Sequence, residues 1–403
     1  MRVLLGAFGD PGHAFPVLAL GEELVARGHD VAIETWQKWR EPAEARGMTF
    51  AAAPEYQVFP TREVPLKPYE AAAKAALVSR ELVASFAPDV VVADILTAAP
   101  ALAADLEGVP RATLVPHVFP DLPTGFPPFS IGARLPRTRV GRALSAQTDR
   151  LVAKGVEQGR LEYNDCRAQL GLPPLAYGHT GLSRELTMIG TFPQLEYPRA
   201  WPAWTQIVGP MLWEPGGPRV EPGPGDGPVV LVATSTSQDH SHSLLRACLE
   251  GLADEPVRVI AISEEREAPA NAVLVPWMSY ADTMPHCDLV VCHGGHGTVA
   301  RALASGVPVL ICPAAGDMAE NAARVDWAGV GVRLAPRFCT AWGVRLAVRR
   351  ALRSRVLHAG TPRRGGGGRS ALRGRIGRRQ APSGRPLAGP RPRPGLCGEG
   401  RGA

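Results

Sequence analysis

Short apolar runs that stop abruptly, each followed by a segment of helical periodicity, constrain this chain more than any other feature. Residues 1–8 (MRVLLGAF) read as a buried strand, and the residues after them carry apolar side chains at helical spacing until Gly28 ends the helix. Residues 30–35 (DVAIET) form the next expected strand, and the pattern returns at 88–95 (PDVVVADI). An order of strand, helix and strand implies a right-handed crossover and a parallel sheet. We therefore predict a doubly wound α/β domain in the N-terminal half.

A stretch dense in proline and glycine, residues 198–228, separates this half from a second one. Such a composition is incompatible with both a helix and a central strand, so we place a linker there. Beyond it the strand-then-loop pattern resumes at VVLVA and continues through PVRVIAI, DLVVCH, GVPVLICP and GVGVRL. We predict an α/β fold of two Rossmann-like doubly wound domains, 1–200 and 229–352, joined by an interdomain linker at 201–228 and facing each other across a cleft.

The composition excludes several classes of protein. Hydrophobic residues make up 45% of the 403 residues, and no apolar window of about 18 residues occurs, which is typical of a soluble globular protein. The first apolar run meets Asp10 too soon for a secretory signal, so we expect a cytoplasmic protein without stable membrane association. The seven cysteines form no CxxC pair and no zinc-like spacing, so we expect buried free thiols and no structural metal.

The formal charge of +6 comes from the end of the chain. Residues 353–403 hold 13 arginines, one glutamate and no lysine, so the rest of the chain is mildly acidic. This tail is mostly Arg, Gly, Pro and Ala without an apolar period, and we predict that it is disordered. It could bind single-stranded nucleic acid through charge and guanidinium stacking. We favour instead an aberrant C-terminus, because these four residue types are what a GC-rich gene yields when read out of frame, and we do not expect nucleic acid as a partner.

The stretch VVCHGGHGTVARALAS, from Val290, places two histidines and three glycines between a buried strand and a short helix. The loop 293–298 is therefore expected at the carboxyl end of a strand and at the N-terminus of a helix. Backbone N–H groups at such a place attract anions, and glycines let a phosphate come close. The loop matches neither GxGxxG nor the P-loop, so on its own it leaves a plain tight turn open.

Residues at neighbouring strand ends suit the other parts of a nucleotide sugar. Trp277 follows the expected strand before the loop, where an indole could stack on a base. Asp317 begins the helix after the loop, where a carboxylate could accept hydrogen bonds from sugar hydroxyls. A core tryptophan and an ordinary helix-terminal aspartate are the alternatives. The run 234–237 (TSTS) offers hydroxyls that could donate to phosphate oxygens or form only a Ser/Thr-rich turn.

From Trp277 to about Leu334 the sequence resembles the nucleotide-sugar-binding region of family 1 glycosyltransferases, which have the GT-B fold and include bacterial enzymes that decorate natural products. The HGGHGT…GVP…P…GD…N run carries the resemblance most specifically, and the likeness extends from Met1 to about Leu352. It implies an enzyme of antibiotic biosynthesis and secondary metabolism, with an acceptor-binding N-terminal domain and a nucleotide-sugar-binding C-terminal domain. The donor-binding residues that it implies are Ser235, Thr236, Trp277, Met278, His293, Gly294, Gly295, Gly297, Thr298, Asp317 and Met318.

Two positions depart from the pattern of that family. Arg301 stands where a glutamate often holds the ribose, and Met318 follows Asp317 where glutamine is common. A less hydroxylated sugar would suit Met318, so a deoxysugar donor is one expectation. Whether dTDP or UDP carries the sugar, and whether it moves to a hydroxyl or to a carbon, stay open.

His13 and Asp94 are the expected catalytic pair. His13 lies in a turn rich in Gly and Pro after the first strand, and Asp94 ends a central strand of the same domain, so both side chains can reach one rim of the sheet. An imidazole can take the proton of an acceptor hydroxyl near neutral pH, and a carboxylate bonded to it fixes its tautomer and stabilises its charged form. A capping or core histidine is the ordinary alternative. No cofactor or metal is expected, because a helix N-terminus and loop donors can stabilise the departing diphosphate.

Acceptor contacts are expected from two N-terminal loops, 54–60 (PEYQVFP) and 116–129 (PHVFPDLPTGFPPF). Aromatic side chains among prolines suit a large planar or apolar acceptor, although ordinary surface loops would look the same. The candidate acceptor-binding residues are Phe59, His117, Phe119 and Phe126. Two other functions compete with sugar transfer: a nucleotide-sugar epimerase on the same fold, and a non-catalytic nucleic-acid binder acting through the tail. A homodimer is possible.

Overall fold

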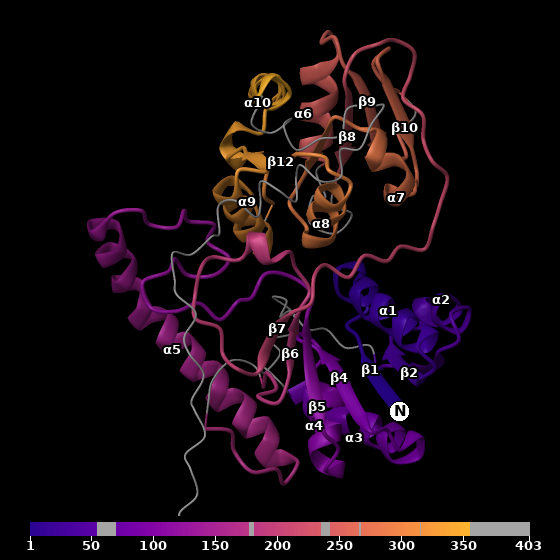
Figure 1. Ribbon diagram of the computed structural model, residues 1–403, viewed down its shortest axis with the longest axis vertical. Coiled ribbons are helices and arrows are strands. Elements are labelled where there is room, and N and C mark those ends of the chain that lie inside the picture. The colour runs from indigo at the N-terminus through magenta and orange to yellow at the C-terminus, as the bar shows by residue number, and fades with distance from the viewer. Residues whose placement is uncertain (55–69, 177–180, 235–241, 266, 315, 355–403) are drawn as a thin grey trace, which may run out of the picture.

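Two lobes, each built on a parallel sheet, make up the protein (Figure 1). The computed structural model describes residues 1–54, 70–176, 181–234, 242–265, 267–314 and 316–354. All but the first two residues of the expected disordered tail, 353–403, lie outside these ranges.

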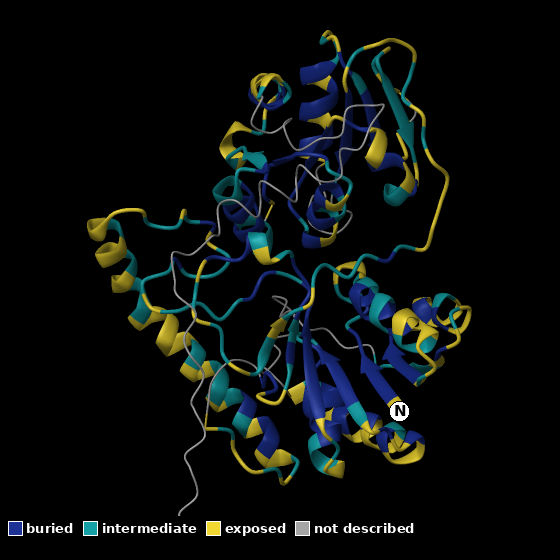
Figure 2. Cartoon of the chain, viewed as in Figure 1, coloured by how far each residue is buried: buried dark blue, intermediate teal, exposed yellow. Residues whose placement is uncertain are grey.

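The N-lobe is formed by seven parallel strands in the order β3-β2-β1-β4-β5-β6-β7 and the helices around them. Its strands are β1 (Arg2–Gly6), β2 (Asp30–Thr35), β3 (Thr49–Ala52), β4 (Val90–Asp94), β5 (Arg111–Val115), β6 (Thr187–Ile189) and β7 (Thr205–Ile207). Its helices are α1 (Pro11–Ala26), η1 (Gln37–Trp39), α2 (Arg40–Glu44), α3 (Glu70–Phe86), α4 (Ala98–Glu107), α5 (Arg139–Gln169) and η2 (Pro193–Leu195). The long helix α5 lies on the outside of the lobe and is largely exposed (Figure 2).

The C-lobe is formed by six parallel strands in the order β10-β9-β8-β11-β12-β13. Its strands are β8 (Val229–Ala233), β9 (Arg258–Ile262), β10 (Ala272–Val275), β11 (Leu289–Cys292), β12 (Val309–Ile311) and β13 (Gly331–Arg333). Its helices are α6 (Ser243–Leu252), α7 (Tyr280–Thr283), η3 (Met284–His286), α8 (His296–Ala304), α9 (Asp317–Ala328), η4 (Pro336–Phe338) and α10 (Ala341–Arg353).

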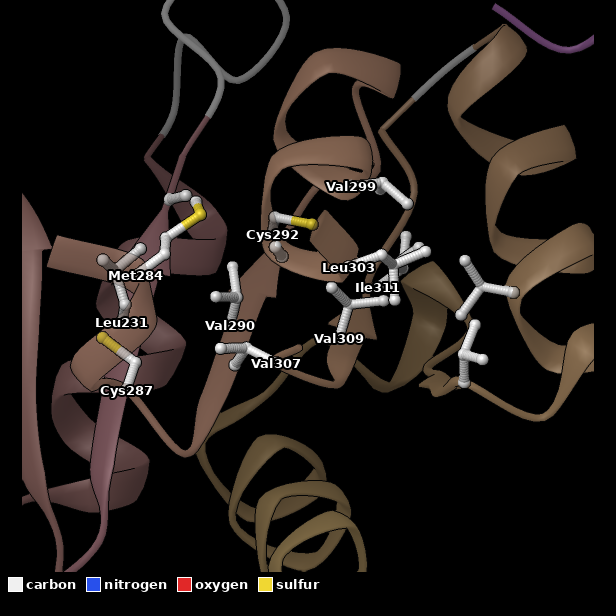
Figure 3. Close-up of a cluster of buried hydrophobic side chains, with 14 of the residues drawn as sticks. Leu231, Met284, Cys287, Val290, Cys292, Val299, Leu303, Val307, Val309 and Ile311 are labelled. Carbon is white, nitrogen blue, oxygen red and sulfur yellow. The ribbon is translucent and has the colours of Figure 1, made fainter. Parts of the chain in front are cut away.

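Both faces of the C-lobe sheet are covered, which explains why its strands read as continuous apolar runs. Alternate residues of β8 point to opposite sides: Val229 and Leu231 join a core with residues of α8 and α9, whereas Val230 and Val232 join a second core with residues of α6 and α10. Figure 3 shows the first of these cores, where aliphatic and sulfur side chains of β11, α8 and β12 meet. Each fully buried aliphatic side chain contributes about 1.5–3 kcal/mol.

Helix α1 begins earlier than its apolar spacing predicts. The sequence suggested a turn rich in Gly and Pro around His13, ahead of the helix, but the helix already starts at Pro11. Proline is compatible with the first helical position, because the N–H that it lacks would have no partner inside the helix there. His13 therefore lies in the first turn of α1 and not in a free loop.

The predicted linker region contains the last strand of the N-lobe sheet. β7 (Thr205–Ile207) lies within the range 201–228 and pairs with β6, and Trp213 is buried in the N-lobe core. The two lobes also share apolar packing, since Val118 and Leu195 of the N-lobe belong to the same core as the strands of the C-lobe. The division at 1–200, 201–228 and 229–352 stays a prediction.

The predicted fold class is confirmed: two doubly wound parallel α/β domains. Cys339 is half-buried, whereas Cys166, Cys248, Cys287 and Cys292 are buried free thiols, as expected. Burial raises the pKa of each of these buried thiols, for instance that of Cys292 to about 12. Among the described helices, not one combines the length and the apolar character needed to cross a bilayer.

Candidate active site between the lobes

The catalytic pair and the HGGHGT loop lie at the carboxyl ends of the strands where each sheet reverses its order. In the N-lobe this switch point lies between β1 and β4, and in the C-lobe it lies between β8 and β11. Crossovers leave in opposite directions at such a point, so the loops after the two strands spread apart and leave room for a ligand. His13 follows β1, Asp94 ends β4, and the HGGHGT loop follows β11. The run after β8 holds Ser235 and Thr236, which lie outside the described residues.

His13 and Asp94 form a hydrogen-bonded pair at the N-lobe switch point. Nδ1 of His13 lies 2.8 Å from Oδ1 of Asp94. The aspartate side chain is fully buried, whereas 18% of the imidazole is exposed. The other carboxylate oxygen, Oδ2, accepts from the Leu96 N–H at 3.3 Å and from the Thr97 hydroxyl at 3.5 Å. Because an ionised carboxylate only accepts, the proton of the neutral imidazole belongs on Nδ1, and Nε2 is the basic nitrogen.

Two neighbouring imidazoles have opposite protonation tendencies. Burial lowers the pKa of His13, but the charge and hydrogen bond of Asp94, together with the charge of Asp317 from the C-lobe, raise it above its usual value. The ring of His117 lies 6.2 Å away, and burial and the charge of His13 lower the pKa of His117. Nδ1 of His117 donates to the Val118 carbonyl at 2.8 Å. The imidazole paired with the carboxylate therefore holds a second proton more readily than its neighbour.

The HGGHGT loop brings glycine backbone to the N-terminus of α8. Gly294 has φ +92°, and a Cβ there would lie 2.6 Å from Cγ2 of Ile311 and 3.0 Å from the Met318 carbonyl oxygen, so only glycine fits. A Cβ on Gly295 or Gly297 would meet nothing within 4 Å. The first N–H groups of an α-helix have no partner inside it, so this end of α8 can receive an anion.

The two histidines of the loop differ in what they contact. His293 is 5% exposed, and its Nδ1 donates to the Cys312 carbonyl at 3.1 Å. His296 begins α8 and reaches the N-lobe, where its Nε2 lies 3.3 Å from the Gly190 carbonyl. Its Nδ1 lies 3.2 Å from Oδ1 of Asn321, and burial, with the charge of His117, lowers the pKa of His296 to about 4. His296 is not among the residues predicted from the sequence, because no spacing rule signals a contact with a residue 106 positions away.

The predicted base and sugar contacts lie beside this loop. Trp277 follows β10 and is 46% exposed, so its indole has surface to offer a ligand. Met278 is 2% exposed and lies in the core, which leaves only its backbone for such a contact. Asp317 and Met318 open α9, both partly exposed, and the backbone of Met318 packs against Gly294. The charge of Asp317 favours the protonated imidazoles of both His13 and His117, although burial and the charge of His13 leave the pKa of His117 lowered overall.

The predicted acceptor residues do not share one environment. His117 is half-buried and stacks on Phe129 at 6.0 Å. Phe126 is half-buried beside Tyr197. Phe119 is fully buried among Trp201, Trp204 and Arg199, so its ring has no exposed surface for an acceptor. Phe59 lies outside the described residues. The aromatic composition of the 116–129 loop did not reveal which rings turn inwards, because the loop packs partly against its own lobe.

A buried charge network joins the two lobes. The side chain of Arg324 on α9 is 0% exposed; its Nε donates to Glu320 at 2.7 Å and its Nη1 to Glu196 of the N-lobe at 2.9 Å. Its guanidinium also lies over the Tyr197 ring at 3.7 Å. The other oxygen of Glu196 accepts from the Phe119 N–H at 2.6 Å. This network thus connects the helix that begins with Asp317 to the loop that carries His117.

This network could not be predicted from the sequence. Its one local signal is that charged residues at positions 320 and 324 are four apart on one face of a helix, which usually indicates an exposed pair. In the structure that face is turned towards the other lobe, and the partner Glu196 is 128 residues away. Within the described ranges, no group of three His, Cys, Asp or Glu side chains could hold a metal ion.

Comparison with known proteins finds one family and many full-length likenesses. Residues 255–364 match the family described as erythromycin biosynthesis protein CIII-like, C-terminal domain. The 4'-demethylrebeccamycin synthase of Lentzea aerocolonigenes is 29% identical over 392 residues, which cover 87% of this chain and 91% of that protein. The O-mycaminosyltylonolide 6-deoxyallosyltransferase of Streptomyces fradiae is 29% identical over 394 residues, covering 86% of this chain and 90% of that protein.

Solved structures have the same fold. The glycosyltransferase VinC in complex with dTDP aligns with a TM-score of 0.64 and 19% identity, over 94% of this chain and 96% of that chain. At this identity the likeness establishes the two-lobed fold alone.

Proposed function

Since this chain belongs to the family 1 natural-product glycosyltransferases with the GT-B fold, we propose that it transfers a sugar, in one inverting step, from a dTDP- or UDP-sugar to a hydroxyl of a small hydrophobic acceptor. One observation carries this proposal. The hydrogen-bonded pair of His13 and Asp94 lies in one lobe, and Asp317, at the start of a helix of the other lobe, is close enough to raise the pKa of His13. The proposed base, His13, and the carboxylate proposed to contact the sugar, Asp317, thus come from opposite lobes and lie near the same point between them.

We assign the proton transfer to Nε2 of His13. As the acceptor oxygen attacks the anomeric carbon, its proton passes to Nε2, and the bond from that carbon to the diphosphate oxygen breaks. A single displacement of this kind inverts the anomeric centre. Asp94 holds the proton on Nδ1 and stabilises the imidazolium that forms, while its burial keeps water from competing for the carboxylate.

We assign the leaving nucleoside diphosphate to the end of α8. Negative charge grows on the diphosphate as the sugar departs, and backbone N–H groups at a helix N-terminus stabilise such charge without reorganising. Gly295 and Gly297 leave this approach open, because neither position carries a side chain. Thr298 in the first turn is half-buried and adds a hydroxyl donor.

The donor sugar and the acceptor are proposed from Met318 and from the relatives. A methionine beside Asp317 offers a hydroxyl only a weak acceptor, its thioether sulfur, which favours a sugar with fewer hydroxyl groups. The Streptomyces fradiae relative is named for transfer of a 6-deoxyallosyl group, and VinC was solved with dTDP. Half-buried His117, Phe126 and Phe129 support a planar or apolar acceptor. Cytoplasmic location and homodimerisation stay predictions.

The proposal is tested by replacing the base. With dTDP-glucose or UDP-glucose as donor and 4-methylumbelliferone as a planar acceptor, His13→Ala should lower the transfer rate by roughly 10²–10⁴-fold, the usual contribution of a general base. His286→Ala, an exposed histidine of the C-lobe, is the control and should keep the wild-type rate. From an α-linked donor, the product should be the β-glycoside by its proton coupling constant. Unchanged turnover in His13→Ala would remove His13 from the mechanism, and an α-glycoside would exclude single inversion.

A further inference from the structure

The chain between the lobes is attached to the segment that carries Trp277. Five hydrogen bonds join residues 214–220 to residues 277–283. Two of them end on one oxygen, Oε1 of Glu214, which accepts from the Ser279 hydroxyl at 2.7 Å and from the Ala281 N–H at 3.0 Å. This segment of the linker therefore follows the C-lobe closely, although most of its residues are exposed.

Trp277 itself is held by two glycines of this segment. Its indole Nε1–H donates to the Gly216 carbonyl at 2.7 Å. Gly217 has φ +156°, and a Cβ there would lie 2.6 Å from Nε1 and 2.8 Å from Cδ1 of the same indole. The Ser279 N–H, two residues on, donates to the Pro218 carbonyl at 3.0 Å. The indole ring thus rests on linker backbone at a position where any side chain would displace it.

The other end of the segment is anchored in the N-lobe. Trp213 is 6% exposed and packs edge-on against Phe15 at 4.9 Å, and the Arg46 guanidinium lies over its ring at 4.6 Å. Phe15 belongs to α1, two residues after His13. Residues 213 and 214 are therefore adjacent in the chain but are fixed to different lobes, and the support behind Trp277 starts from the helix that carries His13.

We propose that linker residues 214–220 are part of the nucleotide site, with Gly216 and Gly217 as positioning residues that set the plane of the Trp277 indole on which the base stacks. The inference rests on the base contact in the proposed function. Because Gly216 already takes the indole N–H, Trp277 offers the base only its ring surface. Stacking depends on the planar ring of the base and not on its substituents. The same linker support therefore serves uracil and thymine alike.

Titration calorimetry with UDP and with dTDP tests this proposal on the whole chain. Trp277→Ala should raise both Kd values by roughly 5- to 150-fold, the range for loss of one base–aromatic stack. Gly217→Ala should raise both by at least about fivefold, by the same factor for the two nucleotides. The matched control is Gly225→Ala, since Gly225 also has a positive φ, +116°, but its Cβ would meet only Arg258, at 3.9 Å. That variant should bind both nucleotides as the wild type does.

A double variant separates positioning from general damage. In the Trp277→Ala background, Gly217→Ala should add nothing to the Kd, because the ring that it displaces is gone; an additive loss would overturn the inference. So would a Gly217→Ala chain that binds like Gly225→Ala. Should Gly217→Ala prove too unstable to titrate, Trp277→Phe keeps a ring but loses the N–H to Gly216, and it should weaken both nucleotides by a similar factor. Wild-type binding by Trp277→Ala would instead refute the base contact in the proposed function itself.

Discussion

Replacing Asp94 with asparagine should change the tautomer of His13 as well as remove a charge. In the wild type, Oδ1 faces His13 and Oδ2 faces two donors, the Leu96 N–H and the Thr97 hydroxyl. An asparagine must place its NH₂ on one of these sides. Facing Leu96, the NH₂ would oppose another donor, so the amide should turn its NH₂ towards His13. Nδ1 of His13 must then accept, which puts the proton on Nε2, where the base is needed.

The loss of the charged hydrogen bond and the change of tautomer together determine how far the transfer rate falls. A hydrogen bond to a charged group contributes about 1.5–3 kcal/mol, so losing it from the transition state alone lowers the rate by roughly 10- to 150-fold. A wrong tautomer costs more, up to about 10⁴-fold where it has been isolated in a catalytic triad. Because the donors around Oδ2 favour the turned amide, we expect Asp94→Asn to lower kcat by about 10³-fold or more.

The pH dependence gives a second, independent readout. In the proposed mechanism transfer needs neutral His13, so the wild-type rate should fall as pH drops through a pKa that lies above the usual 6.5. Burial opposes the charge of His13, and without Asp94 this effect dominates and the pKa of His13 falls. The acidic limb of the rate–pH profile should therefore move to lower pH in Asp94→Asn, even though every rate is smaller.

The assay is the initial rate of transfer from dTDP-glucose to 4-methylumbelliferone between pH 5 and 9. Asp89→Asn is the matched control. Asp89 directly precedes the amino end of the same strand, β4, whereas Asp94 lies at its carboxyl end. Asp89 is exposed and accepts from the Arg2 N–H at 2.8 Å. It should leave both rate and profile unchanged. An Asp94→Asn rate within threefold of the wild type, or an acidic limb that stays in place, would refute the assignment of Asp94 as the partner of the base.

Three further variants test other parts of the structure. Arg324→Met leaves two carboxylates buried without their cation and should cost about 3–5 kcal/mol of unfolding free energy in chemical denaturation; a loss below 1 kcal/mol would contradict the buried network. Gly294→Ala puts a Cβ into Ile311 at φ +92° and should weaken UDP binding and lower the melting temperature, whereas Gly295→Ala, with open space, should keep the melting temperature. Glu34 on β2 is 3% exposed, and burial raises its pKa from 4.5 to about 7. Between these pH values the unfolded chain has released the proton that the folded chain retains, so stability falls by up to about 3 kcal/mol as pH rises. Glu34→Gln should abolish this fall. Equal melting temperatures of the wild type and Glu34→Gln at pH 8 would argue against the raised pKa of Glu34.

Much of the fold could be predicted from the sequence because its signals are local. The buried strands ending at Gly6 and Asp94 are continuous apolar runs, and a parallel sheet produces such runs wherever helices cover both of its faces. The same locality placed His13, Asp94 and the HGGHGT loop at strand ends, where loops carry function. The start of α1 at Pro11 was missed, since apolar spacing begins only where the helix meets the core.

Which side chains meet across the lobes was decided by the tertiary structure alone. Nothing within a few residues of Glu196, Arg324 or His296 signals their contacts with the other lobe, because those partners lie more than one hundred positions away. Phe119 and Phe126 belong to one loop of uniform aromatic character, yet one ring is buried in its own lobe and the other is half-exposed. The sequence by itself determined two doubly wound lobes and the strand ends at which the candidate site lies, because the apolar runs and the loops that end them are local features of the chain. The tertiary structure decided how those lobes are joined, because burial of a charge or a ring depends on what packs against it.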